Sequence, residues 1–151
     1  MKYGRLRAIV AAVAAAAASG ASAEGVVAPG SVVMSEDGLV AAPLTSTPGD
    51  GYRAVQAFID ADKGNCVACH HNADVEGTGQ SGDVGPVLTL IGDKNAEAKL
   101  RAILVDAPAV FGEETAMPAY YVADDVGETI LDAQEIEDIV AYLLELHRYL
   151  D

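Results

Sequence analysis

The two cysteines of this 151-residue chain stand three positions apart, in the pentapeptide Cys66-Val67-Ala68-Cys69-His70. In a helical turn, thiols at this spacing point to one side, and the histidine lies one turn on from the first cysteine. Each thiol can then add to one vinyl group of a haem, while the imidazole ligates the iron from one face. The pattern is typical of c-type haem attachment. It predicts one covalent haem c, bound through Cys66 and Cys69, with His70 as an iron ligand.

A zinc half-site, a redox dithiol and a structural disulfide are the alternative interpretations of this motif. Zinc would need two further good ligands, and only His71 and His147 remain besides scattered carboxylates. A thioredoxin-like dithiol follows a strand and precedes a long helix, whereas Gly64 and Asn65 precede this motif and a glycine-rich loop follows it. The sequence therefore favours haem attachment over all three.

The N-terminal segment, residues 1–23, has the organisation of a signal peptide. Three basic residues lie among the first seven, an apolar run fills positions 8–18, and Ala21-Ser22-Ala23 forms a small-residue cleavage site. An uncleaved anchor is the alternative, but the apolar run is too short to span a bilayer comfortably. We therefore expect an exported chain without a membrane span, which for a bacterial cytochrome c means the periplasm.

The net negative charge of the chain limits which binding partners it can have. The chain has 9 basic and 23 acidic residues, and cleavage after position 23 would leave 6 against 23, a formal net charge of −17. Such acidity disfavours nucleic acid and anionic membrane surfaces as partners. Two explanations stay open: simple solubility, and steering toward a basic face of a protein partner.

About 128 residues remain after cleavage, enough for one domain. Residues 24–51 are rich in Gly, Pro, Ser, Thr and Val and show no helical period, so they predict an extended N-terminal arm. Residues 52–151 then form the cytochrome domain. Whether the arm packs against this domain or against a partner stays open, because free termini are often disordered unless they are docked.

Helical periodicity begins at Tyr52, and Gly64 offers a stop just before the haem motif. Residues 71–89 contain several glycines among polar residues and predict a loop. A short helix is expected from about Ala96 to Asp106, ended by Pro108.

The last helix has the clearest signals. Asp132 and Glu135 form a capping-box-like start. An apolar stripe then runs through Ile136, Ile139, Val140, Leu143, His147 and Leu150. No strand-like alternation and no internal repeat occur. The predicted fold class is all-α: a class I cytochrome c-like helical domain wrapped around the haem.

Met117 is the predicted second axial ligand of the iron. It lies in Thr115-Ala116-Met117-Pro118, a segment without helical period, and the following proline favours an extended backbone that can aim the sulfur. A thioether opposite imidazole raises the reduction potential, which suits electron transfer. The alternative is a methionine that fills a gap in the core. Met34 is the other methionine outside the signal peptide.

Two histidines compete with Met117. His71 adjoins His70 and would have to reach the opposite haem face from the same short turn, so it is better interpreted as a solvated loop residue. His147 lies on the apolar stripe, where a core or interface histidine is the simpler interpretation. Gly85-Pro86 suggests the support for His70, because a ligating imidazole commonly donates its far N–H to a carbonyl, here that of Pro86. An ordinary Gly-Pro turn is the alternative.

Together these segments resemble the SoxX family, the small monohaem cytochrome subunits of SoxAX thiosulfate-oxidising complexes. The resemblance is carried by four segments and the arm: Gly64-Asn65-Cys66-Val67-Ala68-Cys69-His70, Gly85-Pro86-Val87-Leu88, Thr115-Ala116-Met117-Pro118-Ala119-Tyr120, Gln134-Glu135-Ile136-Glu137-Asp138-Ile139-Val140-Ala141-Tyr142-Leu143 and Leu44-Thr45-Ser46-Thr47-Pro48-Gly49-Asp50. The haem motif and Met-Pro are shared with class I cytochromes c at large, while the arm and the Met-Pro-Ala-Tyr context favour SoxX.

The resemblance implies that Cys66 and Cys69 carry the haem and that His70 and Met117 ligate its iron. It also implies a heterodimer with a SoxA-type cytochrome, which would supply the site where thiosulfate is joined to a cysteine of a SoxYZ-type carrier. The chain would be the electron-transfer subunit of an L-cysteine S-thiosulfotransferase complex, with the carrier and a downstream electron acceptor as transient partners. No catalytic residue is expected in this chain, because both thiols are consumed by the haem.

Two other functions use the same residues. A free cytochrome c could shuttle electrons between a periplasmic dehydrogenase and an oxidase, although a shuttle has no evident need for the arm. An open-site haem enzyme or gas sensor would require that Met117 leave the iron free.

Overall fold

The structure is a computed structural model that describes residues 25–78 and 82–146. The predicted signal peptide, residues 1–23, lies outside this range. The α-helices are α1 (Gly51–Ile59), α2 (Ile91–Lys94), α3 (Glu97–Val105), α4 (Ala107–Phe111) and α5 (Ala133–Glu145), with short 3₁₀ turns η1 (Pro29–Ser31), η2 (Cys66–Ala68) and η3 (Ala73–Thr78). Within the described residues there is no strand, only an isolated bridge between Val26 and Thr45, so the all-α prediction is confirmed.

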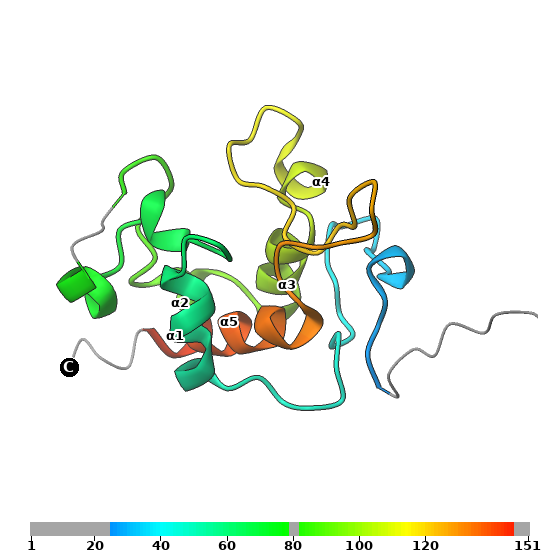
Figure 1. Ribbon diagram of the computed structural model, residues 1–151, viewed down its shortest axis with the longest axis horizontal. Coiled ribbons are helices and arrows are strands. Elements are labelled where there is room, and N and C mark those ends of the chain that lie inside the picture. The colour runs from blue at the N-terminus through cyan, green and yellow to red at the C-terminus, as the bar shows by residue number, and fades with distance from the viewer. Residues whose placement is uncertain (1–24, 79–81, 147–151) are drawn as a thin grey trace, which may run out of the picture.

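Helix α5 is the centre of the fold, and α1, α2 and α3 all pack against it (Figure 1). The predicted capping box is present: Asp132 accepts from the Glu135 backbone N–H, and the Glu135 side chain accepts from the Asp132 N–H. The predicted apolar stripe is buried where the structure describes it, with Ile136 and Ile139 fully covered. His147 and Leu150 lie outside the described residues.

At two positions, Gly49 and Gly92, the backbone passes so close to α5 that only glycine fits. A Cβ at Gly49 would lie 2.1 Å from the Glu137 carbonyl oxygen, and one at Gly92 would lie 2.5 Å from that of Leu143. Because these neighbours are backbone atoms of a helix, they cannot move aside cheaply. Any side chain at either position would therefore push α1 or α2 away from α5.

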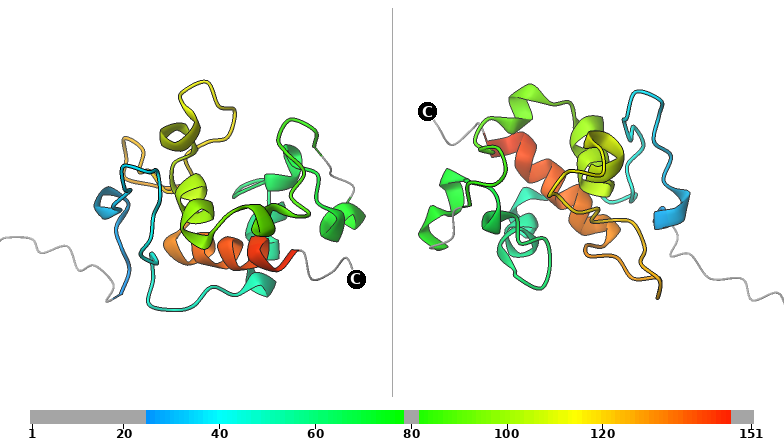
Figure 2. Two further views of the ribbon diagram at one scale, coloured as in Figure 1. Left: turned by 180° about the vertical axis from the view of Figure 1, so that it is seen from behind. Right: turned by 90° about the horizontal axis from the view of Figure 1, so that it is seen from above.

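The N-terminal arm packs on the domain of its own chain. Its Val40 and Leu44 side chains are buried in the same core as the helices. The arm folds back on itself, with Val27 N–H donating to the Leu44 carbonyl at 2.8 Å, and Figure 2 shows it running along one side of the molecule beside α3. The open choice between domain and partner is therefore decided in favour of the domain for these residues.

A buried ion pair fixes the arm in place. The Arg101 guanidinium of α3 donates to Glu137 of α5 from Nε at 2.8 Å and from Nη2 at 2.9 Å, and to the Val40 carbonyl from Nη1 at 3.0 Å. The Glu137 carboxylate also accepts from Leu44 N–H at 2.8 Å. The arm thus supplies one acceptor to Arg101 and one donor to Glu137, two buried charges that would be costly to bury without such partners.

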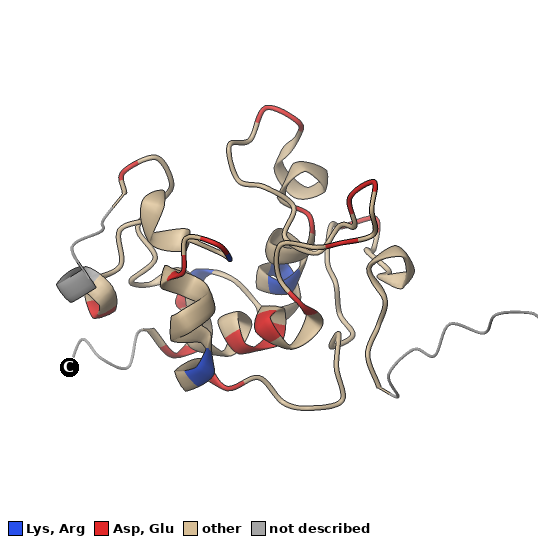
Figure 3. Ribbon diagram, in the orientation of Figure 1, with Lys and Arg blue, Asp and Glu red and all other residues tan. Residues whose placement is uncertain are grey.

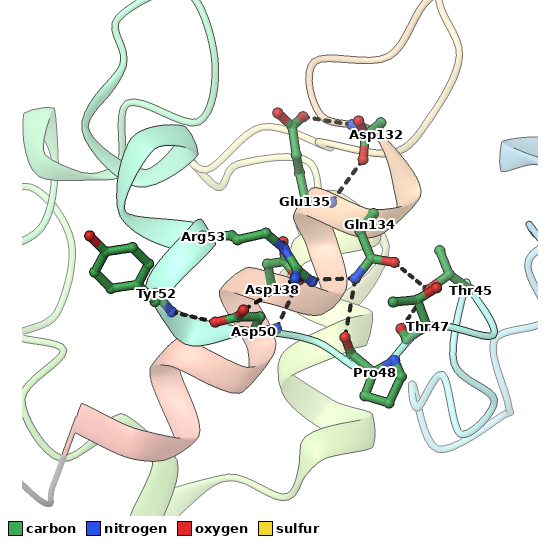
Figure 4. A network of polar contacts seen from close by, with 10 residues as sticks. All are labelled: Thr45, Thr47, Pro48, Asp50, Tyr52, Arg53, Asp132, Gln134, Glu135 and Asp138. Carbon is green, nitrogen blue, oxygen red and sulfur yellow. Dashed lines mark hydrogen bonds and ion pairs between the residues drawn. The ribbon is translucent and has the colours of Figure 1, made fainter.

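A second polar network joins the entry of α1 to α5 (Figure 4). Asp138 accepts from Arg53 Nε at 2.9 Å and Nη2 at 2.8 Å, from Asp50 N–H at 2.8 Å and from Gln134 at 2.9 Å. Burial alone would raise the pKa of this carboxyl, but these donors together lower it below its usual range. Gln134 also contacts Thr45 of the arm at 2.8 Å.

The structure differs from the sequence-based expectations in several details, and α2 was not predicted. Helix α1 ends at Ile59 rather than near Gly64, because the chain turns back at residues 60–64 and Gly64 N–H donates to the Ala57 carbonyl at 3.0 Å. The predicted loop 71–89 contains the 3₁₀ turn η3. Pro108 lies in the first turn of a further helix, α4, instead of only ending one, because proline fits a first turn, where no N–H partner is needed.

None of the helices in the described part of the chain is long and apolar enough to cross a membrane.

Candidate haem site

The haem-attachment motif follows α1 in the chain and lies in a tight turn, residues 64–70, called the attachment turn below. Asn65 has a left-handed backbone (φ 44°), which reverses the chain direction, and η2 then carries Cys66. His70 N–H donates to the Cys66 carbonyl at 2.9 Å, so the two cysteines and the histidine lie within one compact turn. Cys66 is buried, whereas Cys69 and His70 are half-buried.

The segment 82–88 folds back over this turn and supports His70. Backbone bonds join Gly82 N–H to the Val67 carbonyl at 2.9 Å and Gly85 N–H to the Cys69 carbonyl at 2.8 Å. A Cβ at Gly85 would lie 2.3 Å from Cε1 of His70, so only glycine lets the backbone approach the imidazole this closely.

The Pro86 carbonyl oxygen lies 2.7 Å from Nδ1 of His70. Since a carbonyl oxygen only accepts hydrogen bonds, Nδ1 must carry the proton. The other ring nitrogen, Nε2, then keeps its lone pair and is the atom that can bind a metal. The bond therefore fixes both the tautomer and the orientation of the ring.

Met117 lies in the loop between α4 and α5. Its N–H donates to the Thr115 hydroxyl at 3.3 Å, and Thr115 N–H donates to the Gly112 carbonyl at 3.1 Å, so the loop has internal order. After Met117 the chain is fixed to the end of α3, where Tyr120 N–H donates to the Leu104 carbonyl at 3.2 Å. Both connections hold the thioether beside the core.

These segments enclose a cavity of about 380 Å³, within the range of small-molecule sites. Residues of the attachment turn, of the Met117 loop and of α5 all line it. Its polar and sulfur-bearing lining residues include Asn65, Cys66, Cys69, His70 and Met117. The rest of the lining is mainly apolar, from Phe58, Pro86, Leu100, Ile103, Leu104, Ile139 and Leu143.

The buried groups in the site are uncharged at neutral pH. Burial raises the pKa of the Cys66 thiol to about 12. Burial, and then the neighbouring cysteine sulfurs, raises the pKa of Tyr120 well above its usual range, so its phenol stays protonated and donates to the Gly64 carbonyl at 3.2 Å.

The outer surface near Met117 is acidic. Between residues 106 and 132 the charged residues are all Asp or Glu, among them Glu113 and Glu114. Figure 3 shows the Lys and Arg residues on and around α1, α2 and α3, away from this loop. Arg53, Lys63 and Arg101 are engaged in ion pairs.

The cavity brings together all the predicted site residues: Cys66, Cys69, His70, Pro86 and Met117. Met34 and His71 do not line it, and His147 lies outside the described residues. No cluster of three or more His, Cys, Asp or Glu side chains suited to a metal ion occurs among the described residues, so the zinc alternative gains no further ligands there.

Tyr120 and Asn65 are among the lining residues that were not singled out from the sequence as site residues. Tyr120 bridges the Met117 loop to the attachment turn, and Asn65 places a buried side-chain oxygen there without a hydrogen-bond partner among the described residues. Their positions next to the haem motif and to Met117-Pro118 could have marked them as candidate site residues. The Tyr120 contact, however, joins segments far apart in the chain, so it could not be predicted from local sequence.

The residues present fit a covalent haem. Two thiols, an imidazole with a fixed tautomer and a thioether face a largely apolar cavity, and glycine at position 85 leaves the imidazole free of collision. The unsatisfied oxygen of Asn65 is a further polar group available at the cavity wall. This donor set is the one expected for haem iron with His and Met axial ligands.

Comparisons with known proteins agree with this geometry. The family model of cytochrome c matches residues 52–147. Among solved structures, the chain is similar to the crystal structure of SoxXA from P. pantotrophus, with 36% sequence identity and a TM-score of 0.75. The similarity covers 80% of this chain and 97% of that chain. No curated protein matched the chain by sequence.

Proposed function

Because this chain belongs to the cytochrome c family and, within it, to SoxX, we propose that it is the electron-transfer subunit of a periplasmic SoxAX complex that oxidises thiosulfate. In this proposal it pairs with a SoxA-type cytochrome and receives the electrons released when thiosulfate is joined to a SoxYZ-type carrier. The observation that carries the proposal is the convergence of Cys66, Cys69, His70 and Met117 on one apolar cavity.

Each of the predicted site residues would have a separate role in holding one haem. Cys66 and Cys69 would form the thioether links, His70 would present Nε2 because Pro86 occupies Nδ1, and Met117 would offer its sulfur to the iron. When bound, the haem supplies a one-electron Fe(III)/Fe(II) couple. Because His70 and Met117 would both bind the iron, the chain would transfer electrons and would leave no iron site for a substrate.

Two apolar side chains that line the cavity are also exposed to solvent. Val84 is 67% exposed and Phe111 58% exposed, although both line it. A partner that covers these side chains would exclude water and come close to the cofactor, while the acidic loop around Glu113 favours an approaching basic face.

A diffusible electron shuttle is the alternative function. The arm is weaker evidence for a complex subunit than its length suggested, because its residues Val40 and Leu44 pack in the chain's own core. The likeness to the SoxXA structure over 97% of that chain is the observation that supports the subunit.

Replacement of the proposed sulfur ligand tests the site. In the oxidised haem protein, Met117→Ala should abolish the weak long-wavelength sulfur-to-iron charge-transfer band and lower the reduction potential, because the Fe–S bond is lost. Met34→Ala is the matched control: Met34 is half-buried but does not line the cavity, so the band should remain. A band that survives Met117→Ala would contradict the ligand assignment.

The complex is tested by purification of the native protein and by reconstitution. We expect a second haem-bearing chain to co-purify, and thiosulfate conjugation to a carrier cysteine to occur only when that chain is present. The isolated subunit should be reducible by small reductants but inactive in conjugation. Conjugation by the isolated subunit would overturn the non-catalytic role, and isolation as a single chain would support the shuttle.

A further inference from the structure

Tyr120 connects the two segments that carry the proposed iron ligands. It stands three positions after Met117, and its hydroxyl donates to the carbonyl of Gly64, two positions before Cys66, at 3.2 Å. Tyr120 is 7% exposed and lines the cavity. This is a tertiary contact between residues 56 positions apart in the chain.

The backbone on both sides of this bond is itself fixed. Tyr120 N–H donates to the Leu104 carbonyl at 3.2 Å, and the Tyr120 carbonyl accepts from Leu131 N–H at 3.0 Å. On the other side, Gly64 N–H donates to the Ala57 carbonyl at 3.0 Å. The Tyr120 hydroxyl therefore joins two anchored segments, and the short stretch 117–119 has little freedom to move the Met117 sulfur.

The next residue provides an internal comparison. Tyr121 is also buried and also donates one hydrogen bond from its hydroxyl, at 2.7 Å, but to the Val27 carbonyl of the arm. Tyr121 does not line the cavity. The two tyrosines thus have the same chemistry and similar burial, and differ in whether their bond reaches the attachment turn.

We propose that Tyr120 is a positioning residue for Met117: its hydroxyl bond to Gly64 holds the Met117 loop against the attachment turn and so keeps the thioether in the cavity. This inference rests on the proposed assignment of Met117 as an iron ligand. Loss of the hydroxyl leaves the aromatic ring and its packing in place and removes only the connection between the segments. The sulfur then competes less well for the iron.

Competition with added imidazole measures this effect in the oxidised haem protein. Imidazole displaces a weakly held methionine, and loss of the charge-transfer band reports the displacement. Tyr120→Phe should tighten imidazole binding roughly three- to tenfold, the change expected for one lost net hydrogen bond. Tyr121→Phe, the matched control, should bind imidazole as the wild type does. Urea unfolding of both variants records their overall destabilisation separately.

The outcomes separate this inference from the ligand assignment. If Tyr120→Phe binds imidazole like the wild type, or if both variants tighten binding equally, Tyr120 has no specific positioning role and the inference is overturned. In either case, loss of the band in Met117→Ala would leave the ligand assignment standing. If Met117→Ala keeps the band, the ligand assignment itself fails. Tighter binding in Tyr120→Phe alone supports the inference.

Discussion

The substitution Glu137→Gln tests whether the buried ion pair with Arg101 holds the arm to the domain. The Glu137 side chain is 6% exposed and that of Arg101 is 1% exposed, so water cannot solvate the Arg101 guanidinium in place of the lost carboxylate charge. Glutamine has similar shape but offers one oxygen, and its amide group would face the donors of Arg101 or Leu44. The remaining carboxylate partner is Glu97, whose side chain is 57% exposed.

Removal of one partner from a buried pair typically costs about 3–5 kcal/mol, and the residual contact with Glu97 favours the lower end. A loss of about 3 kcal/mol would lower the Tm by roughly 11 °C, given about 2.1 cal/mol/K of unfolding entropy per residue over about 128 residues. Urea and thermal unfolding of the haem-loaded protein measure these values. Amide hydrogen exchange should also accelerate at Leu44, whose N–H loses its carboxylate acceptor.

Lys63→Gln is the matched control, because it breaks an ion pair with Glu135 of the same helix, where the Lys63 side chain is 43% exposed. Such surface pairs contribute less than about 1 kcal/mol. Equal stability of Glu137→Gln and Lys63→Gln would refute the reasoning.

Two further predictions follow from the packing around α5. The donors around Asp138 hold its folded-state pKa below the unfolded value of about 3.9, so its contribution to stability is present above that pH and is lost as the pH falls below about 4. Asp138→Asn should therefore make the unfolding free energy less sensitive to pH in this acid range. An unchanged pH profile would contradict the assignment. Gly49→Ala should destabilise the fold by at least about 1–3 kcal/mol because its Cβ would meet the Glu137 carbonyl, whereas Gly30→Ala, with open space around it, should be nearly neutral in the same urea titration.

The sequence by itself determined the elements whose signals are local. The haem motif fixed the cofactor class, and the capping box at Asp132 with the stripe from Ile136 fixed the position of α5, because both depend on residues within a few turns. The choice of Met117 and Pro86 also came from local sequence, and the structure places both at the cavity.

Tertiary structure decided which faces of these elements are covered. Periodicity predicted one buried face for α5, yet Glu137 and Asp138 on its other side are also buried, because the arm and the entry of α1 cover them. No local pattern reveals such burial, since charged residues ordinarily stay exposed and the groups that pair with them come from distant segments. The same reason kept the Tyr120 bond to Gly64 from being predicted: hydrogen bonds between remote parts of the chain exist only once the fold has brought them together.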